Sequence, residues 1–210
     1  MDKILLHPTY FGPVSQFVAM LKAKEVVFEN EDNYQKQTYR NRMYIYGANG
    51  KLLLNIPIKH TGNKSGHQKY RDIRIENDFP WQKQHWKSLE NVYRTSPFFE
   101  FYEDEFFPLY HQNFEFLMDF NYHTLELVLE CLQTDIPFTK TSEFILEPKG
   151  MLNGRTLVEA KNRKPKQLET YPQVFQEKFG FLNDLSIVDL IFNEGPNAVN
   201  YLQQQELSLF

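Results

Sequence analysis

The N-terminal residues contain the pattern that most constrains the fold of this chain. "KILLH" (3–7) is a short apolar run ended by Pro8, and "EVVFEN" (25–30) is a second run, rich in β-branched residues. Both are typical of buried strands, and the segment 12–24 between them has apolar residues at helical spacing. Strand, helix and strand in this order form a βαβ unit with parallel strands and a right-handed crossover. We therefore expect ligands at the carboxyl end of the first strand, in the loop "HPTYFGP" (7–13).

The middle of the chain favours antiparallel strands. "TYRNRMYIYG" (38–47) and "KLLLNIPIKH" (51–60) are strand-like and are separated by "ANG", which predicts a β-hairpin. "YRDIRIEN" (70–77) alternates between polar and apolar residues and predicts a further strand.

The second half of the chain is mainly helical in pattern. Helices are expected at 82–94, from an N-cap at Ser96 onward, at 124–133 and at 184–196, with a strand at 142–147. The predicted fold class is α/β: an N-terminal parallel βαβ (Rossmann-like) unit with a β-hairpin insertion and a helical C-terminal half. We expect a single domain over residues 1–210, in which the polar, basic segment 149–170 is a mobile loop.

Composition narrows the class of function. The net charge of −4 argues against a general nucleic-acid-binding protein, because phosphate binding needs a basic surplus or patch. No apolar run is long enough to span a membrane, and "MDKILLHP" is too short for a signal peptide. Cys131 is the only cysteine, so no internal disulfide can form, and its apolar helical setting predicts a buried thiol. These features favour a cytoplasmic protein.

Generic catalytic and cofactor motifs are absent from the sequence. There is no Gly-rich phosphate loop, no G-x-S-x-G, no H-E-x-x-H and no paired-cysteine pattern, so no cofactor is indicated. His60 and His67 flank a Gly-containing loop, but two histidines without a third ligand do not predict a metal site.

The segment 82–94 is the first candidate contributor to a site. On a helical wheel His85 lies within the apolar face, and a basic stripe runs beside Trp86, formed by Lys83, Lys87 and Arg94. His85 is either a core histidine or a group directed into a cleft, and in both cases a buried imidazole needs a polar partner.

The segment "YRNR" (39–42) is the second candidate contributor. Arg40 and Arg42 alternate along an expected strand, so both should lie on one face, where guanidinium groups suit a phosphate or carboxylate. The alternative is a solvent-exposed face. His7, at the end of the first strand, is either a catalytic residue or a packing residue.

Several stretches together resemble the WbqC-like protein family. They are "LLHPTYFGPVSQFVAML", "YRNRMYI", "LLNIPI", "WQKQHWKSLENVYRTSPFFEFYEDEF", "TSEFIL" and "YPQVF" followed by "GFLNDLSIVDLIFNEGP", in the family's order. The family's Q-P-x-Y-F corresponds to residues 7–11, its N-R pair to Asn41-Arg42, and its K-H-W to residues 84–86. Tyr93, Pro97-Phe98-Phe99 and Leu185-Ser186 also match.

Two departures from the family pattern stand out. The family's Pro-Trp-x-Gly-Tyr-Phe continuation is here "GPVSQF", without the Trp and the Gly, and the segment between Ser142 and Tyr171 is short. Family members occur in O-antigen gene clusters, so the resemblance implies transfer chemistry in surface polysaccharide biosynthesis. The entry strand and loop are also similar to nucleotidyltransferases with an H-x-G-H motif, of which only His7 is present.

Two functions follow from these observations. The first is a transferase that acts on an anionic activated substrate, a nucleotide sugar or an aminoacyl donor. Its predicted catalytic residues are His7, His85 and Tyr10, and its predicted ligand-binding residues are Arg40, Asn41, Arg42, Lys59, Trp86, Lys87 and Tyr93. The second is a non-catalytic ligand-binding or scaffold protein of the same fold.

Overall fold

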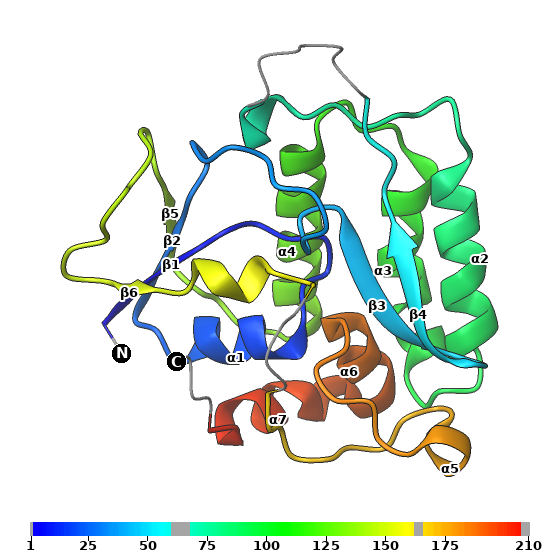
Figure 1. The fold of residues 1–210 in the computed structure, drawn as a ribbon. Helices are drawn as coiled ribbons and strands as arrows, with labels where there is room; N and C mark the ends of the chain where they lie inside the picture. Colours follow the sequence, from blue (N-terminus) through cyan, green and yellow to red (C-terminus); the bar gives the residue numbers. More distant parts are fainter. Residues whose placement is uncertain (1, 60–67, 162–165, 207–210) are drawn as a thin grey trace.

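A computed structural model describes residues 2–59, 68–161 and 166–206. Strand β1 (Lys3–Leu6), helix α1 (Val14–Leu21) and strand β2 (Glu25–Phe28) follow one another, and β1 pairs with β2 in parallel, with Ile4 opposite Val26. The predicted parallel βαβ unit and the α/β class are therefore confirmed (Figure 1).

Two later strands complete the parallel sheet. Strand β5 (Phe138–Lys140) pairs with β2, and strand β6 (Leu152–Asn153) pairs with β1, which gives the order β5-β2-β1-β6. From β1 the chain continues to β2 on one side and returns much later to β6 on the other. The carboxyl ends of β1 and β6 therefore flank the point at which the strand order reverses, the usual place for a ligand in open α/β sheets.

Two of the predicted strands are wrong. Residues 142–147 form no strand, because the backbone after β5 is tied to the Glu29 carboxylate, which accepts from the Thr141 hydroxyl (2.7 Å) and the Ile145 amide (2.9 Å). Residues 70–77 begin as a 3₁₀ helix (Tyr70–Asp72) and then make only isolated bridges. The alternation of polar and apolar residues in this segment arises because Ile73 and Ile75 are buried, although the segment does not pair with another strand along its length.

The hairpin and the helices complete the fold. Strands β3 (Arg42–Gly47) and β4 (Gly50–Asn55) form the predicted antiparallel hairpin. Helix α3 starts at Phe99 and not near Ser96. The Ser96 hydroxyl donates to the Tyr93 carbonyl at the end of the preceding helix (2.7 Å) and does not cap α3. The helices after the hairpin are α2 (Trp81–Tyr93), α3 (Phe99–His111), α4 (Leu117–Cys131), α5 (Gln176–Phe179), α6 (Ile187–Glu194) and α7 (Ala198–Gln204).

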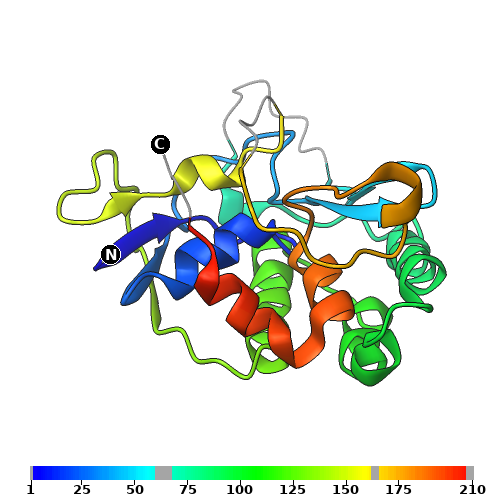
Figure 2. The ribbon, with the colours of Figure 1, turned by 90° about the horizontal axis from the view of Figure 1, so that it is seen from below.

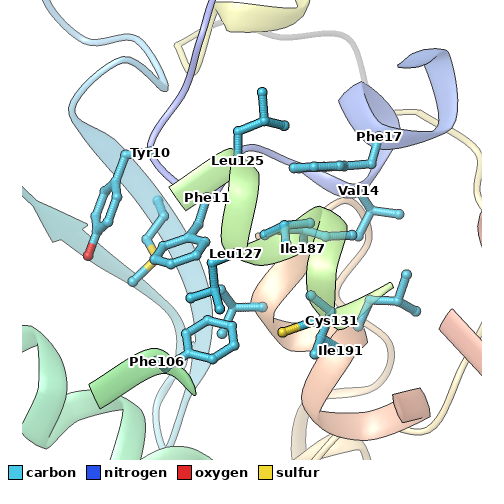
Figure 3. Packing of buried hydrophobic residues seen from close by; sticks show 14 of the residues in the cluster. Tyr10, Phe11, Val14, Phe17, Phe106, Leu125, Leu127, Cys131, Ile187 and Ile191 are labelled. Carbon is cyan, nitrogen blue, oxygen red and sulfur yellow. The ribbon is translucent and has the colours of Figure 1, made fainter. Parts of the chain in front are cut away.

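The hydrophobic core lies where the sheet, α1, α4 and α6 meet. Figures 1 and 2 show the parallel sheet at one end of the molecule, α2 and α3 at the other, and α4 between them. Aromatic and aliphatic side chains from the first loop, α3, α4 and α6 interlock there (Figure 3). Cys131 is buried among them, as predicted, and burial raises the pKa of its thiol to about 12.

The segment 149–170 contains two short regular elements. Within 149–170, whose mobility stays a prediction, residues 152–153 form β6 and Arg155–Val158 form a 3₁₀ helix. Within the described residues, no helix is both long and apolar enough to cross a membrane.

Candidate functional site

His7 occupies the predicted position at the carboxyl end of β1, and a carboxylate holds it there. Its Nε2 lies 2.8 Å from Asp32 Oδ2, and the Arg40 guanidinium donates to the same oxygen at 3.0 Å. His7 and Arg40 are buried, while Asp32 is partly exposed. Arg155, which follows β6, lies close enough to affect the pKa of His7. Charged groups from both sides of the strand-order reversal therefore meet here.

The hydrogen bond to Asp32 fixes the tautomer of His7. Burial lowers the pKa of His7, and the hydrogen bond to Asp32 opposes this effect without cancelling it. The resulting pKa is about 4, so the imidazole is neutral at pH 7. Burial acts to raise the pKa of Asp32, but His7, Arg40 and the Asn33 amide lower it below its ordinary value. An ionised carboxylate only accepts hydrogen bonds, so Nε2 carries the proton and Nδ1 keeps a free lone pair.

The two arginines of "YRNR" do not share a strand face. Arg40 lies in a turn before β3 and is fully buried, with its guanidinium 5.2 Å from the centre of the Tyr70 ring, whereas Arg42 is the first residue of β3. The prediction that both arginines lie on one face of a strand is therefore wrong, because Arg40 comes before the strand begins. Both cations nevertheless approach Tyr34: burial raises the pKa of Tyr34 to about 12, and Arg40 and Arg42 oppose that rise.

Buried polar atoms without a partner gather in this region. Among the described residues, His7 Nδ1, Arg40 Nε and Arg42 Nε make no hydrogen bond, and neither do Asn41 Oδ1 and Asn121 Oδ1. Buried polar groups are nearly always paired, so an unpaired group often marks a position that water or a ligand fills. Two of these atoms are cationic donors and one is a basic nitrogen.

Tyr10 and His85 form a second, separate cluster. The Tyr10 hydroxyl lies 2.8 Å from His85 Nδ1 and 2.9 Å from the Tyr110 hydroxyl, and Trp81 packs edge-on against the imidazole at 5.2 Å. His85 therefore has the polar partner that a buried imidazole needs. Burial lowers its pKa to about 4, although a backbone contact with Asn55 opposes the shift. Tyr10 is sealed in the core (Figure 3), and no hydrogen bond among the described residues joins this cluster to His7.

The other predicted ligand-binding residues are dispersed. Trp86 is buried against aromatic rings of α3, and Tyr93 is buried with its hydroxyl donating to Asp189 at 2.6 Å. Lys59 and Lys87 are exposed. In the basic stripe, Arg94 is neutralised by Glu103 at 2.7 Å and by Glu90 at 3.2 Å.

Asn41 lies between the two arginines and opens onto a groove. Its Nδ2 donates to Asn55 Oδ1 (3.1 Å) and to the Ile56 carbonyl (2.9 Å). The groove has a volume of about 530 Å³, and residues 55–58, Glu76 and Phe79 complete its lining.

Sequence reasoning missed the carboxylates that organise the molecule. Asp32 lies in the polar stretch "NEDNY" (30–34), which gives no periodic signal. Asp189 is buried on α6 and accepts from Tyr93, Tyr171 and Gln173. The importance of Asp32 and Asp189 becomes apparent only from their hydrogen bonds to residues that are distant in the sequence.

Metal binding was not predicted from the sequence. Across the part of the chain that the structure describes, no three His, Cys, Asp or Glu side chains gather closely enough to hold an ion. His60 and His67 lie outside the described residues.

Comparison with known proteins places the chain in a family. The sequence profile of the WbqC-like protein family matches residues 7–161, which include every predicted site residue. A curated relative, "Uncharacterized protein Rv1507c" of Mycobacterium tuberculosis, is 25% identical over 205 residues, covering 85% of this chain and 87% of the relative. No solved structure matches. With the profile extending over most of its length, the chain belongs to the WbqC-like protein family.

Proposed function

We propose that this protein is a transferase that takes an anionic activated substrate at the carboxyl end of β1. The observation that carries the proposal concerns the two ring nitrogens of His7. Nε2 is held by Asp32, while Nδ1 has no hydrogen-bond partner among the described residues. This is the arrangement of a general base oriented by a carboxylate. In this role Nδ1 takes the proton of the acceptor's amine or hydroxyl group as its bond to the transferred group forms.

The arginines would bind the negative charge of the donor. Arg40 shares the Asp32 carboxylate with His7, and Arg40 and Arg42 both lie close enough to Tyr34 to affect its pKa. Among the described residues the Nε atom of each arginine has no partner, and charge-assisted bonds from arginine suit phosphate and carboxylate groups. When the transferred group leaves the donor, the released anion stays paired with these guanidiniums. The resemblance to the family directs this chemistry to surface polysaccharide biosynthesis, with a nucleotide sugar or an aminoacyl donor.

The test is binding of anionic probes, followed by turnover. Thermal unfolding with UDP, UDP-N-acetylglucosamine, coenzyme A and AMP should show stabilisation by at least one probe, because a ligand at 100 times its Kd adds about 2.7 kcal/mol. Arg42→Ala should weaken that probe's binding about 10-fold to 100-fold, the effect of losing one charged hydrogen bond. The matched control is Arg74→Ala, an exposed arginine paired with Glu115. No shift with any probe, or equal effects of both variants, would contradict the proposal.

A second candidate function is binding without catalysis. It is favoured by the burial of Tyr10 and His85, which bond to each other and leave neither group free for a substrate. Once a stabilising probe is found, consumption of a donor of that class by the wild type, lost in His7→Gln, supports the transferase. Stabilisation with no consumption supports the binding protein.

A further inference from the structure

We infer that the groove beside Asn41 is a binding site for a neutral pyranose ring, distinct from the anion site at His7 and the arginines. The groove is built where residues 57–59 run antiparallel to residues 74–76: the Glu76 amide donates to the Pro57 carbonyl and the Lys59 amide to the Arg74 carbonyl, both at 2.9 Å. Its volume of about 530 Å³ lies within the common range for small-molecule sites.

The polar lining of the groove is suited to hydroxyl groups. Asn41 and Asn55 supply carboxamides, Glu76 supplies a carboxylate, and Asn41 Oδ1 is a buried acceptor that has no partner in the described part of the chain. Asn41 Nδ2 already donates to Asn55 and Ile56, so the groups left for sugar hydroxyls are the acceptors Asn41 Oδ1 and Glu76 and the donor Asn55 Nδ2. Glu76 is the only charged group in the described lining, which disfavours a phosphate or another anion here.

The apolar lining is suited to the face of a sugar ring. Phe79 is 63% exposed at the rim of the groove, and residues 56–58 form an aliphatic wall. A pyranose has one face of C–H groups that packs on an aromatic ring, while its equatorial hydroxyls point sideways to polar groups. An exposed ring beside carboxamides and one carboxylate therefore fits a carbohydrate better than a fully apolar ligand.

Saturation-transfer NMR on the full chain tests this inference with glucose, galactose and N-acetylglucosamine as probes. At least one should show saturation of its ring protons, with a Kd of about 1–10 mM for a site this open. Phe79→Ala should weaken the Kd about fivefold to tenfold, the effect of one aromatic contact. Phe101→Ala is the matched control, because Phe101 is 65% exposed on α3 and does not line the groove.

A further variant and the choice of probes separate this site from the anion site. Glu76→Gln should reduce sugar binding. The sugar probes are neutral and the probes for the anion site are charged, so either proposal can fail while the other stands. No saturation of any pyranose would overturn the inference. Equal effects of Phe79→Ala and Phe101→Ala would also overturn it, and so would saturation of a glycine tripeptide with none of the sugars.

Discussion

Asp189 shows how one buried carboxylate can hold three segments of the chain together. It is fully buried on α6 and accepts from Tyr93 of α2, from Tyr171 (2.7 Å) and from Gln173 (2.8 Å). Burial raises the pKa of Asp189, and the three donors oppose the rise. Because the pKa is higher in the folded state than in the unfolded chain, ionisation of Asp189 costs stability, and the cost grows as pH rises from the unfolded value through the folded one.

Removing one donor should make that cost larger. We expect Tyr171→Phe to lower the free energy of unfolding by about 1–3 kcal/mol at pH 7, the effect of losing a bond to a buried charged group. The loss should be smaller at pH 4, where the carboxyl group is more protonated. Urea unfolding at both pH values measures it, with Tyr44→Phe on β3 as the control. Equal losses in the two variants would show that Asp189 gains nothing from the Tyr171 hydroxyl.

At the scale of elements, helices α1 and α6 cap each other. The Asp184 carboxylate, just before α6, accepts from the Ser15 amide (2.8 Å) and the Ser15 hydroxyl (3.0 Å) in the first turn of α1. In return, the Ile187 amide donates to the Gly12 carbonyl at 2.9 Å, and the Ser186 hydroxyl donates to the Phe11 carbonyl at 2.7 Å. These bonds fix the loop that carries His7 against the C-terminal half.

Loss of this cap should destabilise the protein measurably. We expect Asp184→Ala to cost about 1–2 kcal/mol, the effect of removing a helix N-cap. Asp184→Asn should cost less, because its amide oxygen still accepts and asparagine tolerates the φ of 56° found here. Chemical denaturation compares both variants with Asp104→Ala, an exposed change on α3. If Asp184→Asn is as damaging as Asp184→Ala, the carboxylate's charge matters more than its geometry.

For the whole molecule, two buried histidines act to lower stability in acid, and the raised pKa of Asp189 acts in the opposite direction. His7 and His85 have pKa values lowered to about 4 by burial, against about 6.5 in an unfolded chain. Both are neutral in both states at pH 7.5. As pH falls below about 6.5, the unfolded chain binds protons that the folded protein does not, so stability decreases until the folded histidines also titrate near pH 4.

Urea unfolding between pH 7.5 and 4.5 isolates the histidine contribution when the wild type is compared with variants. Each histidine contributes a slope of up to about 1.4 kcal/mol per pH unit. His7→Gln should reduce the dependence of the unfolding free energy on pH by the contribution of about one bound proton. Gln84→Ala, which changes an exposed side chain on α2 that carries no ionisable group, should leave that dependence unchanged. A slope that does not differ between wild type and His7→Gln would mean that His7 titrates alike in both states.

The sequence by itself determined the parts of this protein that depend on local periodicity. The βαβ unit, the hairpin and the buried faces of α1 and α2 follow from apolar residues repeating every two or about 3.6 positions. His7 could be placed at the end of β1 because a proline ends the apolar run directly after it. The helical wheel likewise placed His85 on the buried face of α2, where the structure has it.

Only the tertiary structure decided which polar groups meet. Strands β5 and β6 have 3 and 2 residues, too few for a periodic signal, and they exist because β2 and β1 offer them backbone partners. The Tyr10–His85 hydrogen bond joins residues 75 positions apart in the sequence, and the His7–Asp32 hydrogen bond joins residues 25 positions apart. Hydrogen bonds between distant residues depend on how whole elements pack, which no single stretch of sequence encodes.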